Sequence, residues 1–123
     1  MQMPDAGNKL KGSDGERCAE AYLQRQGLVL LEHNYRCRFG EIDLIMREGN
    51  IIVFIEVRMR TSQVFGGAAG SITLSKQGKL MRTARYYLAS LKSLPECRFD
   101  VVLLSGPWEE GMEWIRNAFC EAA

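Results

Sequence analysis

The chain has 123 residues, of which 46% are hydrophobic and 25% are charged, and its formal net charge is +1. This amount of apolar sequence suffices for one compact domain with its own core, and the balanced charge argues against a protein that coats nucleic acid without selectivity. No segment has the length of a transmembrane helix or the pattern of a signal peptide, so we expect a soluble cytoplasmic protein that does not enter membranes.

Zinc sites and histidine-based catalytic triads are not indicated, because the cysteines are scattered without close spacing and there is a single histidine. These residues are Cys18, Cys37, Cys97, Cys120 and His33.

A first helix is predicted over residues 13–26, after a loose polar arm formed by residues 1–12. Ser13 and Glu16 have the spacing of a capping box, in which the Glu16 carboxylate accepts a hydrogen bond from the Ser13 backbone amide. We expect residues 13–123 to form a single domain.

Two tandem apolar runs flank Gly49 and Asn50, which is the signature of a tight hairpin turn. The turn sets Glu48 opposite Ile51. Both faces of the second run are largely apolar, which predicts a buried, central strand. A shorter strand is predicted before the hairpin, ending at His33-Asn34. The three predicted strands span residues 28–31, 39–47 and 51–58.

Acidic residues interrupt both strands of this hairpin. The register places Asp43 opposite Glu56 and Glu41 opposite Arg58. Two carboxylates facing each other at about 5 Å repel by roughly 3 kcal/mol at an effective dielectric of about 20. A divalent cation, a shared proton or a neighbouring cation of the protein can offset that repulsion, so this pair is the leading candidate for a functional site.

The second half of the chain is predicted to contain a glycine-rich loop at residues 61–71, a helix capped by Thr73 or Ser71 that ends near Leu91, and two strands. The loop lacks the Gly-Lys-Ser/Thr ending of a phosphate-binding loop. The strands span residues 98–104 and 112–119, the latter at an edge. The predicted fold class is therefore α/β, with a mixed five-stranded sheet flanked by helices.

Positive charge is concentrated between Glu56 and Glu96, where the chain has no acidic residue. Such a run favours a polyanionic partner, although for any one of these side chains a solvated helix face, paired with acids from elsewhere, is the better explanation. The charges are Arg58, Arg60, Lys76, Lys79, Arg82, Arg85 and Lys92.

The combination of a helical acid, a hairpin Asp and a Glu-x-basic motif resembles the PD-(D/E)XK nuclease superfamily, in particular Holliday-junction resolvases. Asp43 matches its Asp, and residues 56–58 (EVR) match its Glu-x-Lys. Further segments are similar to the small bacterial YraN-like family, over residues 12–119. They are residues 40–45 (GEIDLI), 54–60 (FIEVRMR), 99–102 (FDVV) and 114–119 (WIRNAF).

The resemblance implies a restriction-endonuclease-like fold and a Mg²⁺ or Mn²⁺ ion held by Asp43, Glu56 and the Val57 carbonyl. Glu16 would orient a water molecule or hold a second ion. Its capping role is an alternative, and Glu20, one helical turn later, is the substitute acid. By resemblance to junction resolvases, a homodimer is also expected.

The chain departs from the superfamily at Arg58, where a lysine is usual. Arginine binds phosphate bidentately but keeps its proton at physiological pH, so the change affects turnover more than binding. Lys76 and Gln77 lie where related nucleases carry a basic or amide residue on the next helix, although an exposed first helical turn would explain them too. The candidate nucleic-acid-binding residues are Arg36, Arg38, Arg58, Arg60, Lys76, Gln77, Lys79 and Arg82.

Three functions follow. The leading one is a protein that binds DNA or another structured nucleic acid and cleaves it with Mg²⁺ or Mn²⁺. The second is a nucleic-acid-binding module without a catalytic metal, whose acids are neutralised by neighbouring arginines. The third is a protein-interaction module that docks an acidic partner on its basic helix. Metal binding distinguishes the first from the second, and the salt dependence of polyanion binding distinguishes both from the third.

Overall fold

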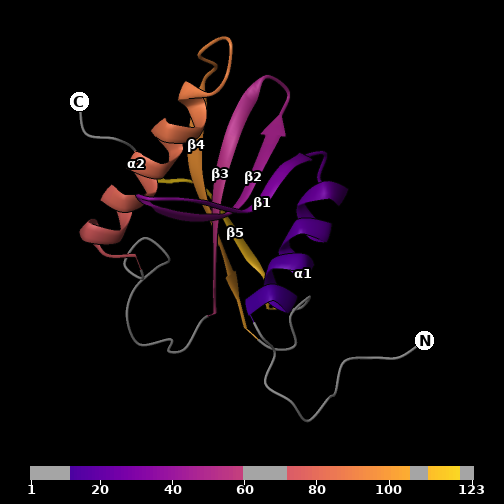
Figure 1. The fold of residues 1–123 in the computed structure, drawn as a ribbon. Helices are drawn as coiled ribbons and strands as arrows, with labels where there is room; N and C mark the ends of the chain where they lie inside the picture. Colours follow the sequence, from indigo (N-terminus) through magenta and orange to yellow (C-terminus); the bar gives the residue numbers. More distant parts are fainter. Residues whose placement is uncertain (1–11, 60–71, 106–110, 120–123) are drawn as a thin grey trace.

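The computed structural model of the chain describes residues 12–59, 72–105 and 111–119, and its order of helices and strands is the predicted one (Figure 1). The glycine-rich loop and residues 1–11 of the predicted N-terminal arm lie outside the described residues, and Gly12, predicted to belong to the arm, begins the first helix. No helix among the described residues is long and apolar enough to cross a membrane. The elements are α1 (Gly12–Arg25), β1 (Val29–Cys37), β2 (Gly40–Glu48), β3 (Ile51–Met59), α2 (Leu74–Ala89), β4 (Cys97–Leu104) and β5 (Glu113–Phe119).

The predicted mixed sheet is confirmed. Its five strands follow one another in the order β1-β2-β3-β4-β5, with β3 and β4 parallel and the other neighbours antiparallel. The parallel step requires a crossover, which α2 supplies. β3 is central and β5 lies at an edge, as predicted.

The two helices cover opposite faces of the sheet, and each closes its own apolar core (Figure 1). Ala19 and Leu23 of α1 pack on one face, and Leu80 and Ala84 of α2 pack on the other. Alternate residues of β3 serve the two cores, because successive side chains of a strand point to opposite faces. Glu56 therefore projects on the same face as Phe54, toward α2.

The predicted hairpin register is confirmed between Leu44↔Ile55 and Glu48↔Ile51, but the β2–β3 ladder goes no further. Just beyond Leu44, the Asp43 side chain accepts the Val57 amide hydrogen bond, with an N–O distance of 2.8 Å. A side chain thus replaces the backbone partner of β3 at this point.

The expected pairing of Glu41 with Arg58 is therefore wrong. Glu41 lies beyond the end of that ladder and forms a salt bridge with Arg36 of β1, with an N–O distance of 3.1 Å. Arg58 is left on the side of Glu56, 3.8 Å from its carboxylate.

The first strand is longer than predicted, because His33 and Asn34 continue it to Cys37 instead of ending it. Asn34 has a positive φ of 53°, a conformation that asparagine tolerates better than most residues. The flanking pairs His33↔Leu44 and Tyr35↔Ile42 place Asn34 opposite Asp43. The strand irregularity therefore coincides with the candidate catalytic acid.

The predicted cap of α2 is confirmed at Thr73, whose hydroxyl accepts the Lys76 amide at 3.1 Å. This bond satisfies one of the orphan amides at the start of the helix. The helix ends at Ala89, slightly before the predicted Leu91.

A second irregularity surrounds Asp100 in β4, whose side chain is fully buried. Its carboxylate accepts hydrogen bonds from Arg98 Nε at 3.0 Å, Trp114 Nε1 at 2.9 Å and the Asn117 amide at 2.9 Å. Asn117 has a positive φ of 52° and lies where the β4–β5 register shifts. The acid that interrupts the apolar β4 sequence is thus a structural link between β4 and the edge strand β5.

Candidate active site

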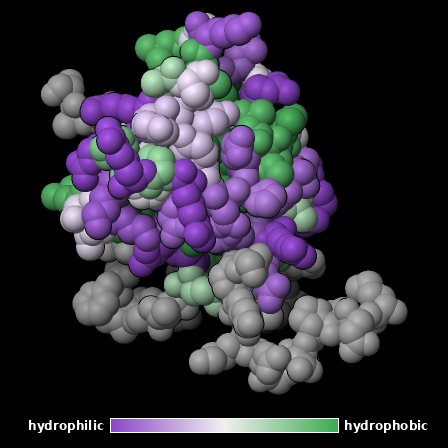
Figure 2. All heavy atoms as spheres, viewed as in Figure 1, coloured by the Kyte–Doolittle hydropathy of each residue, from purple (hydrophilic) through white to green (hydrophobic). Residues whose placement is uncertain are grey.

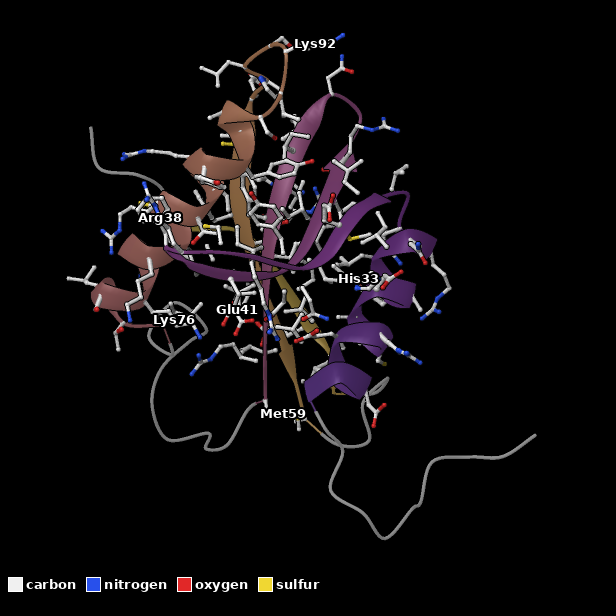
Figure 3. The ribbon with its side chains drawn as sticks, viewed as in Figure 1. His33, Arg38, Glu41, Met59, Lys76 and Lys92 are labelled. Carbon is white, nitrogen blue, oxygen red and sulfur yellow. The ribbon has the colours of Figure 1, made fainter. Side chains whose placement is uncertain are left out.

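Asp43 of β2 and Glu56 of β3 line one pocket of about 340 Å³, together with residues from the start of α2. The pocket lies where β2 begins and β3 approaches its end at Met59. Lys76 of α2 and Glu41 of β2 lie in this half of the molecule, whereas Lys92 lies at the opposite end (Figure 3). The acidic pair therefore lies between the sheet and α2, a position that the hairpin register did not address.

The Asp43 carboxyl group is held by three neighbours. One oxygen accepts the Val57 amide, and the group also shares hydrogen bonds with Glu16 and Glu56. The pKa of Asp43 is raised to about 6. Burial is the largest cause of the rise and the charge of Glu16 contributes to it, while the hydrogen bond from the Val57 amide acts in the opposite direction. Asp43 thus holds its proton to a higher pH than an ordinary aspartate and loses it near pH 6.

Glu56 is only 7% exposed. Its pKa is raised to about 7, first by burial and then by the charge of Asp43. Lys76 Nζ lies 2.8 Å from one oxygen of Glu56 and lowers its pKa, without cancelling the other two effects. The two acids are therefore a largely buried, hydrogen-bonded pair, with Lys76 as the nearer and Arg58 as the more distant cation.

Glu16 of α1 reaches the same group from the opposite side of the sheet. Burial raises its pKa, the hydrogen bond with Asp43 lowers it, and the charges of Glu41 and Glu56 raise it again. The capping alternative is not tested, because the Ser13 side chain lies outside the described residues. Glu16 and Glu20 both line a separate pocket of about 140 Å³ beside α1, together with His33, whereas Glu16 does not line the pocket that contains Asp43 and Glu56.

The basic candidates differ in their positions. Lys79 lines the acidic pocket. Arg82 is exposed on α2. Arg38 stacks over Phe39, with 5.0 Å between its guanidinium carbon and the ring centre. Gln77 donates its side-chain amide to the Ile72 carbonyl at 3.0 Å, so it supports the start of α2. Arg60 lies outside the described residues.

Sequence reasoning missed the role of Gly40 at this site. A side chain at Gly40 would approach the Thr83 hydroxyl to 3.1 Å, and its φ is +150°, so β2 can lie close to α2 only with glycine here. The glycine directly before the acidic hairpin was the available signal. This close approach brings Lys76 and Lys79 over the acids.

Few protein groups are arranged to bind a metal directly. Among the described residues, no three His, Cys, Asp or Glu side chains form a ready set of ligands. Asp43 and Glu56 thus form a pair of hard oxygen donors that would need further ligands, such as water or a backbone carbonyl, to complete an octahedral shell.

Comparison with known proteins places the chain in a family. The family described as "Uncharacterised protein family UPF0102" matches residues 15–104. The chain is 64% identical over 120 residues to a UPF0102 protein of Nitrosomonas europaea, covering 98% of this chain and 100% of the relative. It is 63% identical over 111 residues to a UPF0102 protein of Nitrosospira multiformis, covering 90% and 93%. It is also 55% identical over 111 residues to one of Methylobacillus flagellatus, covering 90% and 97%.

Proposed function

The chain belongs to the uncharacterised protein family UPF0102, and we propose that it binds structured DNA and cleaves its phosphodiester bonds with Mg²⁺ or Mn²⁺. In this proposal its sheet and acids are those of a PD-(D/E)XK nuclease. One observation carries the proposal. Asp43 and Glu56, both with pKa values raised by burial, meet in a pocket that a lysine of α2 also enters. Buried acids held at a cost to folding are typical of functional sites.

The donor set suits Mg²⁺ or Mn²⁺, because both prefer carboxylate oxygens and keep several water ligands. Asp43 and Glu56 would hold the ion, with the Val57 carbonyl as the third protein ligand that the resemblance implies. When bound, the ion would supply charge stabilisation at the phosphate and activate a water molecule. Its charge would also relieve the repulsion that now raises the pKa of Glu56.

Lys76 would supply the positive charge that the superfamily usually takes from the lysine at the Arg58 position. Its ammonium group already lies 2.8 Å from Glu56, whereas Arg58 lies 3.8 Å away. Both side chains are partly exposed, so both can contact a phosphate in the pocket. Lys76 would bind and orient the phosphate beside the acids, and Arg58 would add a second contact.

The second candidate function, a nucleic-acid-binding module without metal, is favoured by the same salt bridge. In that case Lys76 is the permanent partner of Glu56 and takes the place of an ion. The two functions differ in one measurable property, because only the first requires the acids to bind a divalent cation.

Calorimetric titration with Mn²⁺ tests this difference. We expect the parent protein to bind Mn²⁺ at micromolar to millimolar concentration, and Asp43→Asn and Glu56→Gln to weaken binding at least tenfold, because each removes one of two charged ligands. Glu41→Gln is the matched control, since Glu41 lines the same pocket but pairs with Arg36 and should leave the affinity within about twofold. A parent protein that binds no Mn²⁺ at millimolar concentration would favour the metal-free module.

Cleavage tests the role of Lys76. Lys76→Ala is expected to lower any Mn²⁺-dependent cleavage about 100-fold, the usual effect of deleting one well-placed electrostatic contact, while Arg58→Lys should preserve or raise it. Lys92→Ala, which removes a lysine at the end of the molecule opposite Lys76 (Figure 3), is the control and should have a much smaller effect. Junction, flap, duplex and single-stranded substrates should each be assayed. If neither the parent protein nor Arg58→Lys cleaves any of them, the nuclease proposal fails.

Dimerisation is part of the proposal for junction substrates, since a junction is cut at two strands. Light scattering of the purified protein, with and without a junction, measures it directly.

A further inference from the structure

A stripe of side chains runs along α2 away from the acidic pocket. Ser75, Lys79, Arg82 and Tyr86 follow one another at spacings of four, three and four residues, so they lie on one flank of the helix. All four are exposed, and Tyr86 is 50% exposed despite its large ring. Ser75 and Lys79 also line the pocket that contains Asp43 and Glu56. The stripe thus begins at the candidate active site.

The turn between β1 and β2 lies against this flank. Gly40 approaches Lys79 and Thr83 closely, and the ring of Phe39 contacts Tyr86 edge to face, with 5.9 Å between ring centres. The Arg38 guanidinium lies over the Phe39 ring, with its central carbon 5.0 Å from the ring centre. Arg38 and Lys76 both lie on the α2 side of the molecule, far from His33 beside α1 (Figure 3). Two aromatic rings and a guanidinium group therefore meet at the end of the stripe.

The charged side chains around this aromatic pair are positive. α2 contains no acidic residue, and Arg38, Lys79 and Arg82 are exposed around it. The face of the molecule shown in Figure 2 is predominantly hydrophilic. The exposed Tyr86 ring beside the half-buried Phe39 ring, with basic neighbours, suits single-stranded nucleic acid, whose bases stack on aromatic side chains while its phosphates contact Lys and Arg.

We propose that Tyr86 and Phe39, with Arg38, Lys79 and Arg82, bind an unpaired nucleotide segment and lead it to the acidic pocket. The distance from Lys79 to Tyr86 is about 10 Å along the helix axis at about 1.5 Å per residue, which matches roughly three stacked nucleotides at about 3.4 Å each. The binding of the nucleotide segment is inferred from this surface and does not depend on the proposed nuclease activity. Only the link between binding and cleavage rests on the proposed function. The preferred substrate then carries a single-stranded arm or flap and is not a continuous duplex.

Binding in EDTA tests this surface separately from metal chemistry. The probes are single-stranded DNA and RNA oligonucleotides with one 2-aminopurine, whose fluorescence falls when the base stacks on a ring, and the matching DNA duplex. We expect both single strands to bind at least tenfold more tightly than the duplex, with quenching at one or two probe positions. Tyr86→Ala should weaken binding about tenfold and abolish the quenching, and Tyr86→Phe should keep both near the parent values.

The control substitutions are made at residues outside the stripe. Arg82→Ala should flatten the salt dependence of binding by about one unit of log K against log salt, whereas Arg25→Ala should leave it unchanged, since the exposed Arg25 lies on α1, which covers the opposite face of the sheet (Figure 1). Leu94→Ala, which removes an exposed apolar side chain away from the stripe, should bind as the parent protein does. Circular dichroism melting of each variant verifies folding.

The outcomes separate this proposal from the nuclease proposal. If Tyr86→Ala is folded and binds and quenches like the parent protein, or if duplex binds as tightly as single strand, the surface proposal fails even if Mn²⁺ binding and cleavage are observed. If the stacking signals behave as expected but no Mn²⁺ binds, the surface proposal stands and the nuclease proposal fails. A preference for the RNA or for the DNA oligonucleotide identifies which nucleic acid this surface binds.

Discussion

At pH 8 and without divalent metal, Glu56→Gln is expected to raise the free energy of unfolding by about 2–3 kcal/mol over the parent protein. The reason is the burial of Glu56 next to Asp43, which raises its pKa from 4.5 to about 7. At pH 8 the native protein must keep this group charged in a poorly solvated position, and glutamine removes that cost while keeping the shape. The loss of the salt bridge with Lys76 subtracts part of the gain.

The pH dependence has a definite sign. Below about pH 4.5 Glu56 is protonated in both the folded and the unfolded protein, so glutamine has no advantage. Between pH 4.5 and about 7 the unfolded state loses its proton first, so the stability of the parent protein falls as pH rises. The advantage of Glu56→Gln should therefore grow across this window and level off above it. Asp43→Asn should behave alike between its ordinary pKa of 3.8 and about 6.

Urea unfolding in EDTA between pH 4 and pH 8 measures these differences. Glu48→Gln is the control with the opposite sign, because hydrogen bonds from Arg98 lower the pKa of Glu48 and its charge stabilises the folded protein. Millimolar Mn²⁺ should stabilise the parent protein more than Glu56→Gln, since only the parent keeps both charged ligands. Equal stability of the parent protein and Glu56→Gln at every pH would contradict the buried charge pair.

Asp100→Ala is expected to lower the free energy of unfolding by about 3–5 kcal/mol, the largest effect of any single change considered. The Asp100 carboxylate is fully buried and accepts hydrogen bonds from Arg98, Trp114 and the Asn117 amide. Without it, the Arg98 guanidinium, which is only 14% exposed, keeps Glu48 as its partner but loses the buried one. Its Nη2 atom already has no hydrogen-bond partner among the described residues.

Urea unfolding at pH 7 measures this effect too, with Arg116→Ala as the control. Arg116 is 52% exposed at the rim of the same network, where its salt bridge with Glu48 should contribute less than about 1 kcal/mol. The double variant Arg98→Met with Asp100→Leu should recover much of the loss, because replacing a whole buried ion pair by apolar side chains costs less than breaking it. An Asp100→Ala protein as stable as Arg116→Ala would show that the network does not hold β5 in place.

The sequence alone determined the helices and strands, their order and the turn at Gly49-Asn50, because these depend on local periodicity, capping and turn preferences. Thr73 is an example, since a hydroxyl before an apolar helix pattern needs only its own neighbours to act as a cap. The proximity of Asp43 and Glu56 was also predicted by counting outward from the tight turn, and the two acids do line one pocket, although the paired ladder ends at Leu44↔Ile55.

Only the tertiary structure decided where each strand stops pairing and which cations reach the acids. The β2–β3 ladder ends at Leu44 because the Asp43 carboxylate binds the Val57 amide, and no local pattern reports that exchange. The same exchange separates Glu41 from Arg58. Lys76 reaches Glu56 because Gly40 lets α2 approach the sheet, and Glu16 reaches Asp43 from the opposite helix. Such contacts join residues far apart in the chain, so they depend on how the elements pack and not on the spacing of residues within any one of them.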